Sequence, residues 1–150
     1  MVNVRDVPAD LLIEKLKEEL SKDKNIKIPE WTEFLKSGSH REKSWYQEDW
    51  YFRRLASTLR KVYLRGNIGI QRLSEEYGGR KDNGSKPYHP VAGSRSIVRN
   101  MLKELEQLNL VEKKETGRSV SPKGVSLLQK ASRSVMESLL EKNPELKKYL

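Results

Sequence analysis

The residues best suited to do chemistry in this sequence are cations, and the first group of them lies in one aromatic-rich segment. "EDWYFRRLASTLRKVYLRG" (residues 48–66) places five basic side chains on one side of an ideal helix, with no acid between Trp50 and Arg65: Arg53, Arg54, Arg60, Lys61 and Arg65. An exposed helix in a neutral setting usually has acids four residues from its bases, so that ion pairs form. An unbroken basic face therefore favours contact with phosphate groups. We expect Trp50, by contrast, to be a packing anchor, because large aromatic side chains are mostly buried.

A second group of cations lies in "YGGRKDNGSKPYHPVAGS" (residues 77–94), which has no hydrophobic period. Neighbouring helices are usually joined by about 2–8 residues, so a connection of this length is either disordered or functional. Its glycines would let the backbone approach a phosphate chain, and its side chains offer charge and a stacking face: Arg80, Lys81, Lys86, and Tyr88 or His89. From composition alone, an RNA-clasping loop and a disordered linker are both open.

A third group lies further along the chain. Arg95, Arg99 and Lys103 recur every four residues, which lines them along one edge of a predicted helix. Arg118 follows Thr116-Gly117, the centre of a predicted hairpin, and we place it at the hairpin tip. All three groups together predict a nucleic-acid interface and not a catalytic centre.

Catalysis and metal binding find no support in the sequence. The chain has no cysteine and two well-separated histidines, His40 and His89, so neither a thiol nucleophile nor a zinc site is expected. No Walker motif and no acid pair with an accompanying base can be placed in one pocket. We therefore expect a protein without enzymatic activity, cofactor or metal.

The charge balance points to a polyanionic partner. Thirty Lys+Arg against twenty-one Asp+Glu give a net charge of +9, and the pI is about 9.7. Nucleic acid is the first candidate and an anionic membrane the second. No apolar run approaches the roughly 20 residues of a membrane span, and the first residues lack the apolar core of a signal peptide. We expect a cytoplasmic protein that does not enter a membrane.

Hydrophobic periodicity predicts the elements that must position these cations. The chain length fits one domain, residues 1–150, with a core of about 47–140 on which an N-terminal helical segment, 1–46, packs. The apolar spacings and end signals predict a mainly helical, all-α fold with one short hairpin. The sequence predicts helices at 8–22, 48–65, 69–77, 94–109 and 121–140, and a short helix within 27–40. It predicts the hairpin at 110–121.

Three helices followed by a hairpin and another helix is the order of a winged helix-turn-helix domain. In a DNA-binding domain of this type, about 3–4 residues connect the second and third helices. In this chain the same connection runs from Gly78 to Gly93. A winged-helix DNA-binding regulator is the main alternative, and it would usually be a dimer. A KH-like RNA reader is a weaker alternative, because Gly66 and Gly69 in "RGNIGIQ" have the required spacing but almost no strands are predicted.

Four separated motifs give a family resemblance. "EDWYFRRLASTLRKVYLRG", "IQRLSEEYGGRKDNGSKPYH", "GSRSIVRNMLKELEQLNLVEK" and "GRSVSPKG" closely resemble the S19e family of small-subunit ribosomal proteins of archaea and eukaryotes, and the likeness runs from near the N-terminus to about Ser132. The chain departs from the family at "REKSWYQED", where members carry Glu-Leu-Ala-Pro, and in the tail after Ser134.

The resemblance implies a winged-helix-like protein in the head of the small ribosomal subunit, bound to ribosomal RNA and needed for maturation of that subunit. The implied partners are small-subunit ribosomal RNA and neighbouring head proteins, with a monomer off the ribosome. Arg54 and Arg60 match arginines of the family motif. The resemblance also favours RNA contact for the 77–94 segment.

Overall fold

The order of elements is mainly helical, as the periodicity predicts. The computed structural model describes residues 2–149. Its helices and strands are α1 (Ala9–Ser21), η1 (Glu30–Phe34), α2 (Trp50–Arg65), α3 (Ile70–Glu76), β1 (Gly79–Asn83), β2 (Lys86–Val91), α4 (Arg95–Gln107), β3 (Val111–Lys114), β4 (Gly117–Val120), α5 (Pro122–Lys142) and η2 (Pro144–Tyr149). The short helix expected within 27–40 is a 3₁₀ helix. None of the helices described for residues 2–149 combines the length and apolar character that crossing a membrane requires.

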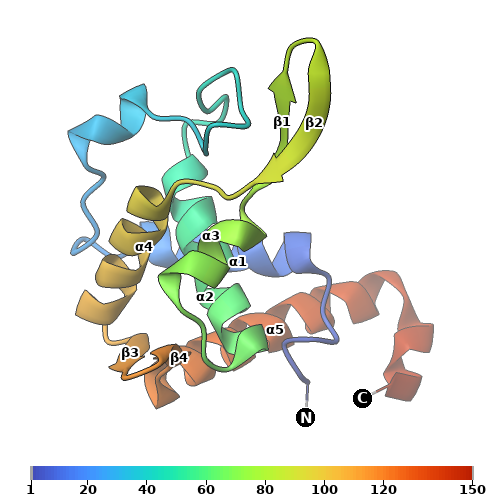
Figure 1. The fold of residues 1–150 in the computed structure, drawn as a ribbon. Coiled ribbons are helices and arrows are strands. Elements are labelled where there is room, and N and C mark those ends of the chain that lie inside the picture. Colours follow the sequence, from blue (N-terminus) through green and yellow to red (C-terminus); the bar gives the residue numbers. More distant parts are fainter. Residues whose placement is uncertain (1, 150) are drawn as a thin grey trace.

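The apolar stripes of four helices form the main core. Helix α1 buries Leu12, Leu16 and Leu20, the residues that its spacing of four predicts. These leucines join buried side chains of α2, α4 and α5 in one cluster. Helix α1 packs against both α2 and α5, and Figure 1 shows it passing behind α2. A smaller cluster, which includes Leu73 of α3 and Leu102 of α4, holds α3 in place.

Local signals set the ends of the last two long helices. The Ser94 side chain accepts a hydrogen bond from the Ile97 N–H at the start of α4, and the Ser121 side chain accepts one from the Gly124 N–H at the start of α5. Serine is a preferred residue at this position, because its side-chain oxygen satisfies a backbone N–H that has no partner within the helix. Strands β3 and β4 pair antiparallel from Val111↔Val120 to Lys114↔Gly117, so the expected hairpin is confirmed.

The expectation of a single hairpin is wrong, because the 77–94 connection folds into a second one. Strands β1 and β2 pair antiparallel with Gly79 opposite Val91 and Lys81 opposite His89. Gly84 has a φ of 72°, and its N–H donates to Asp82 Oδ1 at 2.8 Å in the turn. The disordered-linker alternative is therefore also wrong.

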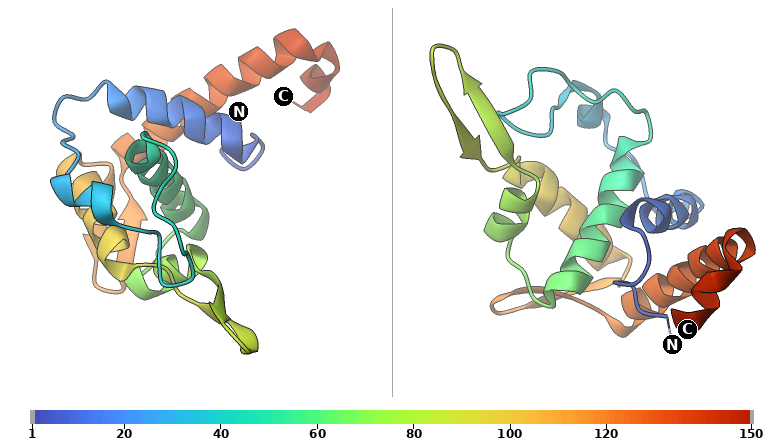
Figure 2. Two further views of the ribbon diagram at one scale, coloured as in Figure 1. Left: turned by 90° about the horizontal axis from the view of Figure 1, so that it is seen from above. Right: turned by 90° about the vertical axis from the view of Figure 1, so that its right-hand side faces the viewer.

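The two hairpins lie at opposite ends of α4. Hairpin β1–β2 projects beside the N-terminus of α4, whereas β3–β4 lies at the far end of that helix (Figure 1). Figure 2 shows the same separation from another side. The cations of the two hairpins therefore do not converge on one point; α4 lies between them.

The packing of α5 on β4 and the preceding segment gives a first prediction. A Cβ atom on Gly124 would overlap the Leu110 carbonyl oxygen and would lie 2.6 Å from Val120 Cγ1. Glycine-to-alanine changes within helices ordinarily stabilise, but overpacking a close contact costs about 1–3 kcal/mol. We expect Gly124→Ala to lower the free energy of unfolding by about that amount, measured by urea denaturation. Ser126→Ala, at an exposed site of the same helix, is the control. A Gly124→Ala protein as stable as the wild type would contradict this packing.

Candidate nucleic-acid interface

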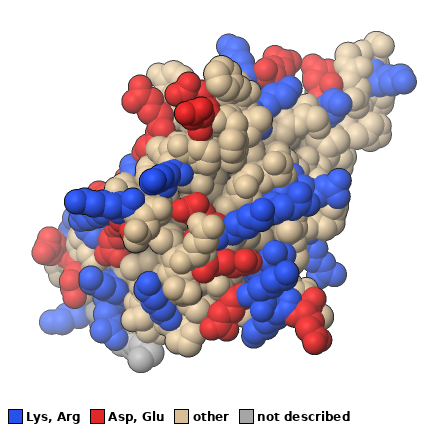
Figure 3. Space-filling view, turned by 90° about the vertical axis from the view of Figure 1, so that its left-hand side faces the viewer, with Lys and Arg blue, Asp and Glu red and all other residues tan. Residues whose placement is uncertain are grey.

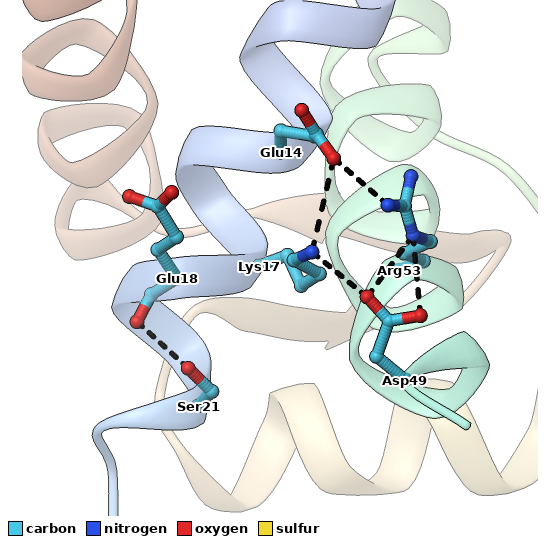
Figure 4. A network of polar contacts seen from close by, with 6 residues as sticks. All are labelled: Glu14, Lys17, Glu18, Ser21, Asp49 and Arg53. Atoms are coloured by element: carbon cyan, nitrogen blue, oxygen red, sulfur yellow. Dashed lines mark hydrogen bonds and ion pairs between the residues drawn. The ribbon is translucent and has the colours of Figure 1, made fainter. Parts of the chain in front are cut away.

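Arg53, the first cation of α2, is paired with acids of the same protein. Its Nη2 donates to Glu14 Oε1 of α1 at 2.8 Å, and its Nε donates to Asp49 Oδ2 at 3.2 Å (Figure 4). Lys17 Nζ of α1 also donates to Asp49 Oδ2, at 2.8 Å. The hydrogen bond from Lys17, supported by Arg53, lowers the pKa of Asp49 below its usual value. Arg53 thus ties α2 to α1.

Arg54 lies between two aromatic rings. Its Cζ is 3.9 Å from the centroid of Tyr77 and 4.9 Å from that of Trp45, and its Nη2 donates to Ser37 Oγ at 3.3 Å. Trp45 in turn stacks on Trp50 with centroids 4.1 Å apart and planes within 3°. Burial lowers the pKa of Arg54. Trp50 is buried, which confirms its role as a packing anchor. We call Trp50, Trp45, Arg54 and Tyr77 the aromatic column.

The last cations of α2 meet an acid of α3. Glu76 pairs with Lys61, whose Nζ lies 3.4 Å from Oε2, and also with Arg65. Burial alone would raise the pKa of Glu76, but the hydrogen bonds and charges of Arg65 and Lys61 outweigh it and lower the pKa. Burial lowers the pKa of Lys61 despite this partner. Among residues 2–149, Arg60 has no ion pair, and its buried Nε has no hydrogen-bond partner.

The interpretation of α2 as a basic face without acidic neighbours is therefore wrong. The helix itself carries no acid there, but α1 supplies Glu14 and α3 supplies Glu76. Helical spacing reports only acids on the same helix, so it could not reveal these partners. Three of the five cations on α2, Arg53, Lys61 and Arg65, therefore have acidic partners within the protein.

Among the predicted nucleic-acid-binding cations, those without an ion pair within residues 2–149 lie on the β1–β2 hairpin and α4, apart from Arg54 and Arg60 of α2. Arg80, Lys86, Arg99 and Lys103 are exposed, and Lys81 is half-buried. Within residues 2–149 none of these five has an ion pair. The exposed Arg95 donates to Gln71 Oε1 at 3.4 Å. Lys and Arg side chains on the face drawn in Figure 3 are mixed with Asp and Glu, so the basic area is interrupted.

Arg118 is not at the hairpin tip, contrary to our expectation. It lies in β4 opposite Lys113, and its backbone N–H and carbonyl both bond to Ile68. Its Nε donates to Glu106 Oε1 at 3.0 Å, and only 17% of its side chain is exposed. The residue before Gly117 in the turn is Thr116, whose Oγ1 accepts from Asn67 Nδ2 at 2.6 Å. Arg118 thus helps to hold β4 in place.

One feature of this region was missed in the sequence. A cavity of about 650 Å³ lies between the 37–46 segment and the β1–β2 hairpin, lined by Ser37, His40, Arg41, Glu42, Lys43, Ser44, Trp45, Tyr46, Arg54, Arg80, Asp82 and Tyr88. A Cβ atom on Gly79 would lie 2.9 Å from His40 Cδ2, so the imidazole ring packs directly on the hairpin backbone. Burial, with Arg41 and Arg54 nearby, lowers the pKa of His40. The only sequence signal was the aromatic pair Trp45-Tyr46 beside several cations in a stretch expected to be loop.

These features define a small, basic, mainly helical protein with exposed cations on one hairpin and one helix that have no ion pair within residues 2–149, and exposed basic side chains of this kind are typical of proteins that contact nucleic acid. The chain belongs to the ribosomal protein S19e family, whose model matches residues 3–138. It is 47% identical over 150 residues to proteins named small ribosomal subunit protein eS19 from Thermoplasma acidophilum and Thermoplasma volcanium, covering 100% of both chains in each case. It is 42% identical over 153 residues to the protein of the same name from Aeropyrum pernix, again over 100% of both chains.

Proposed function

We propose that this chain is a structural constituent of the small ribosomal subunit and binds small-subunit ribosomal RNA. Full-length similarity to three proteins named for that subunit supports the assignment. The RNA-binding part of the proposal rests on five cations of β1–β2 and α4. Within residues 2–149 none of them has an ion pair: Arg80, Lys81, Lys86, Arg99 and Lys103. Cations that lack an internal partner are free to replace the counterions of a phosphate chain.

We further infer that α2, α3, α4 and β3–β4 form a winged-helix-like unit, extended by α1 and α5. In a DNA-reading protein of this type the third helix enters the major groove with its N-terminal residues at the bases. Here β1–β2 projects beside the N-terminus of the third helix, α4 (Figure 1). A hairpin in that position would obstruct groove entry, and this favours RNA over the alternative of a DNA-binding regulator. A-form RNA is contacted mainly through phosphates, 2′-hydroxyls and unpaired bases.

Several finer parts of the proposal rest on membership of the family. The chain would act as one domain, lie in the head of the subunit beside other head proteins, and be needed for maturation of the subunit. It would work in the cytoplasm, without enzymatic activity, and be a monomer off the ribosome. Of the cations on α2, the structure favours internal roles for Arg53, Arg54, Lys61 and Arg65.

Salt-dependent binding to small-subunit ribosomal RNA tests the proposal. Each phosphate contact adds about 0.7–0.9 to the slope of log affinity against log salt. We expect Arg99→Gln to lower the slope by about that amount. Arg53→Gln is the matched control, since Glu14 and Asp49 already neutralise Arg53, and it should leave the slope unchanged.

A second measurement concerns the subunit. The protein should co-sediment with small ribosomal subunits through a high-salt wash. Recovery only as a free dimer, or salt-independent binding by the wild type, would contradict the proposed function.

A further inference from the structure

The cavity between the 37–46 segment and the β1–β2 hairpin is where unpaired charge and exposed aromatic rings meet. Its two walls come from segments distant in the sequence, and the side chain of Arg54 from α2 also lines it. The walls are joined by the packing of His40 on Gly79. The Ser94 N–H also donates to the Ser37 carbonyl oxygen at 2.9 Å, which ties the 37–46 segment to the start of α4. The volume of about 650 Å³ lies within the usual range for sites that hold a small molecule or a nucleotide.

The cavity carries positive charge that the protein does not neutralise. Arg41, Lys43 and Arg80 line it, and within residues 2–149 none of them has an ion pair. The lining holds two acids, Glu42 and Asp82, against four cations, because Arg54 also lines it, and so its charge is positive on balance. The cations on α2, by comparison, are mostly paired with Glu14, Asp49 or Glu76. The local field therefore favours an anionic ligand.

Two tyrosines at the cavity have rings free for stacking. Tyr46 is 100% exposed and Tyr88 is 56% exposed, and they come from opposite walls. Trp45 lines the same cavity, but Trp50 stacks on its ring and Arg54 lies over it, so it is committed to the aromatic column. Unpaired RNA bases are bound by stacking on such exposed aromatic rings while cations hold the adjoining phosphates.

We propose that this cavity binds one unpaired nucleotide of RNA, whose base stacks on Tyr46 or Tyr88 and whose flanking phosphates contact Arg41, Lys43 and Arg80. The proposal rests on the RNA-binding function proposed above and adds the class of nucleotide and the residues that hold it. An acidic peptide would satisfy the cations but would leave both tyrosine rings without a partner. Paired RNA would present phosphates but no free base to the cavity.

The experiment compares two RNA probes with the full-length protein: an RNA hairpin that contains a single-nucleotide bulge, and the same hairpin fully paired. We expect Tyr46→Ala or Tyr88→Ala, whichever removes the ring on which the base stacks, to weaken binding to the bulged probe by about tenfold, because stacking is lost. Tyr46→Phe and Tyr88→Phe should bind like the wild type, since the ring remains. Binding to the paired probe should be unchanged in all four variants. Phe34→Ala is the matched control, because Phe34 is 83% exposed but lies outside the cavity.

The outcomes separate this proposal from the proposed function. If the tyrosine variants bind the bulged probe like the wild type while Arg99→Gln still lowers the salt slope on ribosomal RNA, the nucleotide pocket is wrong and RNA binding stands. Equal losses on both probes would also overturn the pocket, because the tyrosines would then contact the RNA backbone. Variants that bind RNA normally but are lost from small subunits would assign the cavity to a protein neighbour instead. Absence of salt-dependent binding by the wild type would overturn the proposed function itself.

Discussion

Shortening the β1–β2 hairpin is expected to lower affinity for small-subunit ribosomal RNA by about a hundredfold while leaving the fold intact. Gly79 and Val91 are a paired position, so a two-residue Gly-Ser turn can join them in place of residues 80–90. The change removes Arg80, Lys81 and Lys86, and the slope of log affinity against log salt should fall by roughly 2–3. It also removes Tyr88, and one stacked base contributes about 1–3 kcal/mol.

The fold should survive this change because the hairpin is exposed on both faces. Its residues are exposed from Asp82 to Pro90. Retaining Gly79 keeps the surface on which His40 packs. A full-length variant with Arg80, Lys81 and Lys86 all changed to Gln is the control for charge alone, and it should show the same loss of slope with a smaller loss of affinity. Unchanged affinity and slope in the shortened, folded protein would show the hairpin to be a plain connection.

The same exposure explains why sequence reasoning predicted the helices but not this hairpin. Helix α4 buries Ile97, Val98, Met101, Leu102 and Leu105, and a stripe of that kind is visible as a period of 3.6 residues. A strand is recognised by alternating burial, and β2 has none, since Lys86 to Pro90 are all exposed. Pro87 and Pro90 also argue against a strand unless it has a free edge, as both strands of an isolated hairpin do.

The candidate site was predicted less completely than the fold, because the partners of a charge are set by tertiary contacts. Arg53 and Glu14 are 39 residues apart in the sequence, and no spacing rule connects them. Arg54 was assigned to a phosphate contact by its place on the wheel, but Trp45 and Tyr77 approach it from two other segments. The contact of the exposed hairpin and α4 cations with RNA stays a prediction.

Replacement of Trp50 by alanine is expected to have the largest effect on stability. Trp50 is buried, stacks on Trp45 and meets Tyr51 edge to face at 5.9 Å. Removing a buried tryptophan side chain costs about 3–5 kcal/mol, a large part of the roughly 5–15 kcal/mol that stabilises a typical domain. Urea denaturation of Trp50→Ala should show this loss, and Phe34→Ala, at an exposed aromatic site, should change stability by less than about 0.5 kcal/mol. A small loss in Trp50→Ala would show that the aromatic column is not a stabilising unit.

A double-mutant cycle tests whether the column acts as a unit. Trp50 and Arg54 both lie against Trp45, so removal of either one frees a face of the same ring. We expect the effects of Trp50→Ala and Arg54→Ala on the free energy of unfolding to deviate from additivity by at least about 0.5 kcal/mol, as is usual for side chains that share a partner. If Trp50→Ala leaves too little stability to measure, Trp50→Leu keeps part of the packing and serves in its place. Strict additivity would mean that Arg54 is held by Tyr77 and Ser37 alone, and Trp45 would then contribute to the wall of the cavity without supporting Arg54.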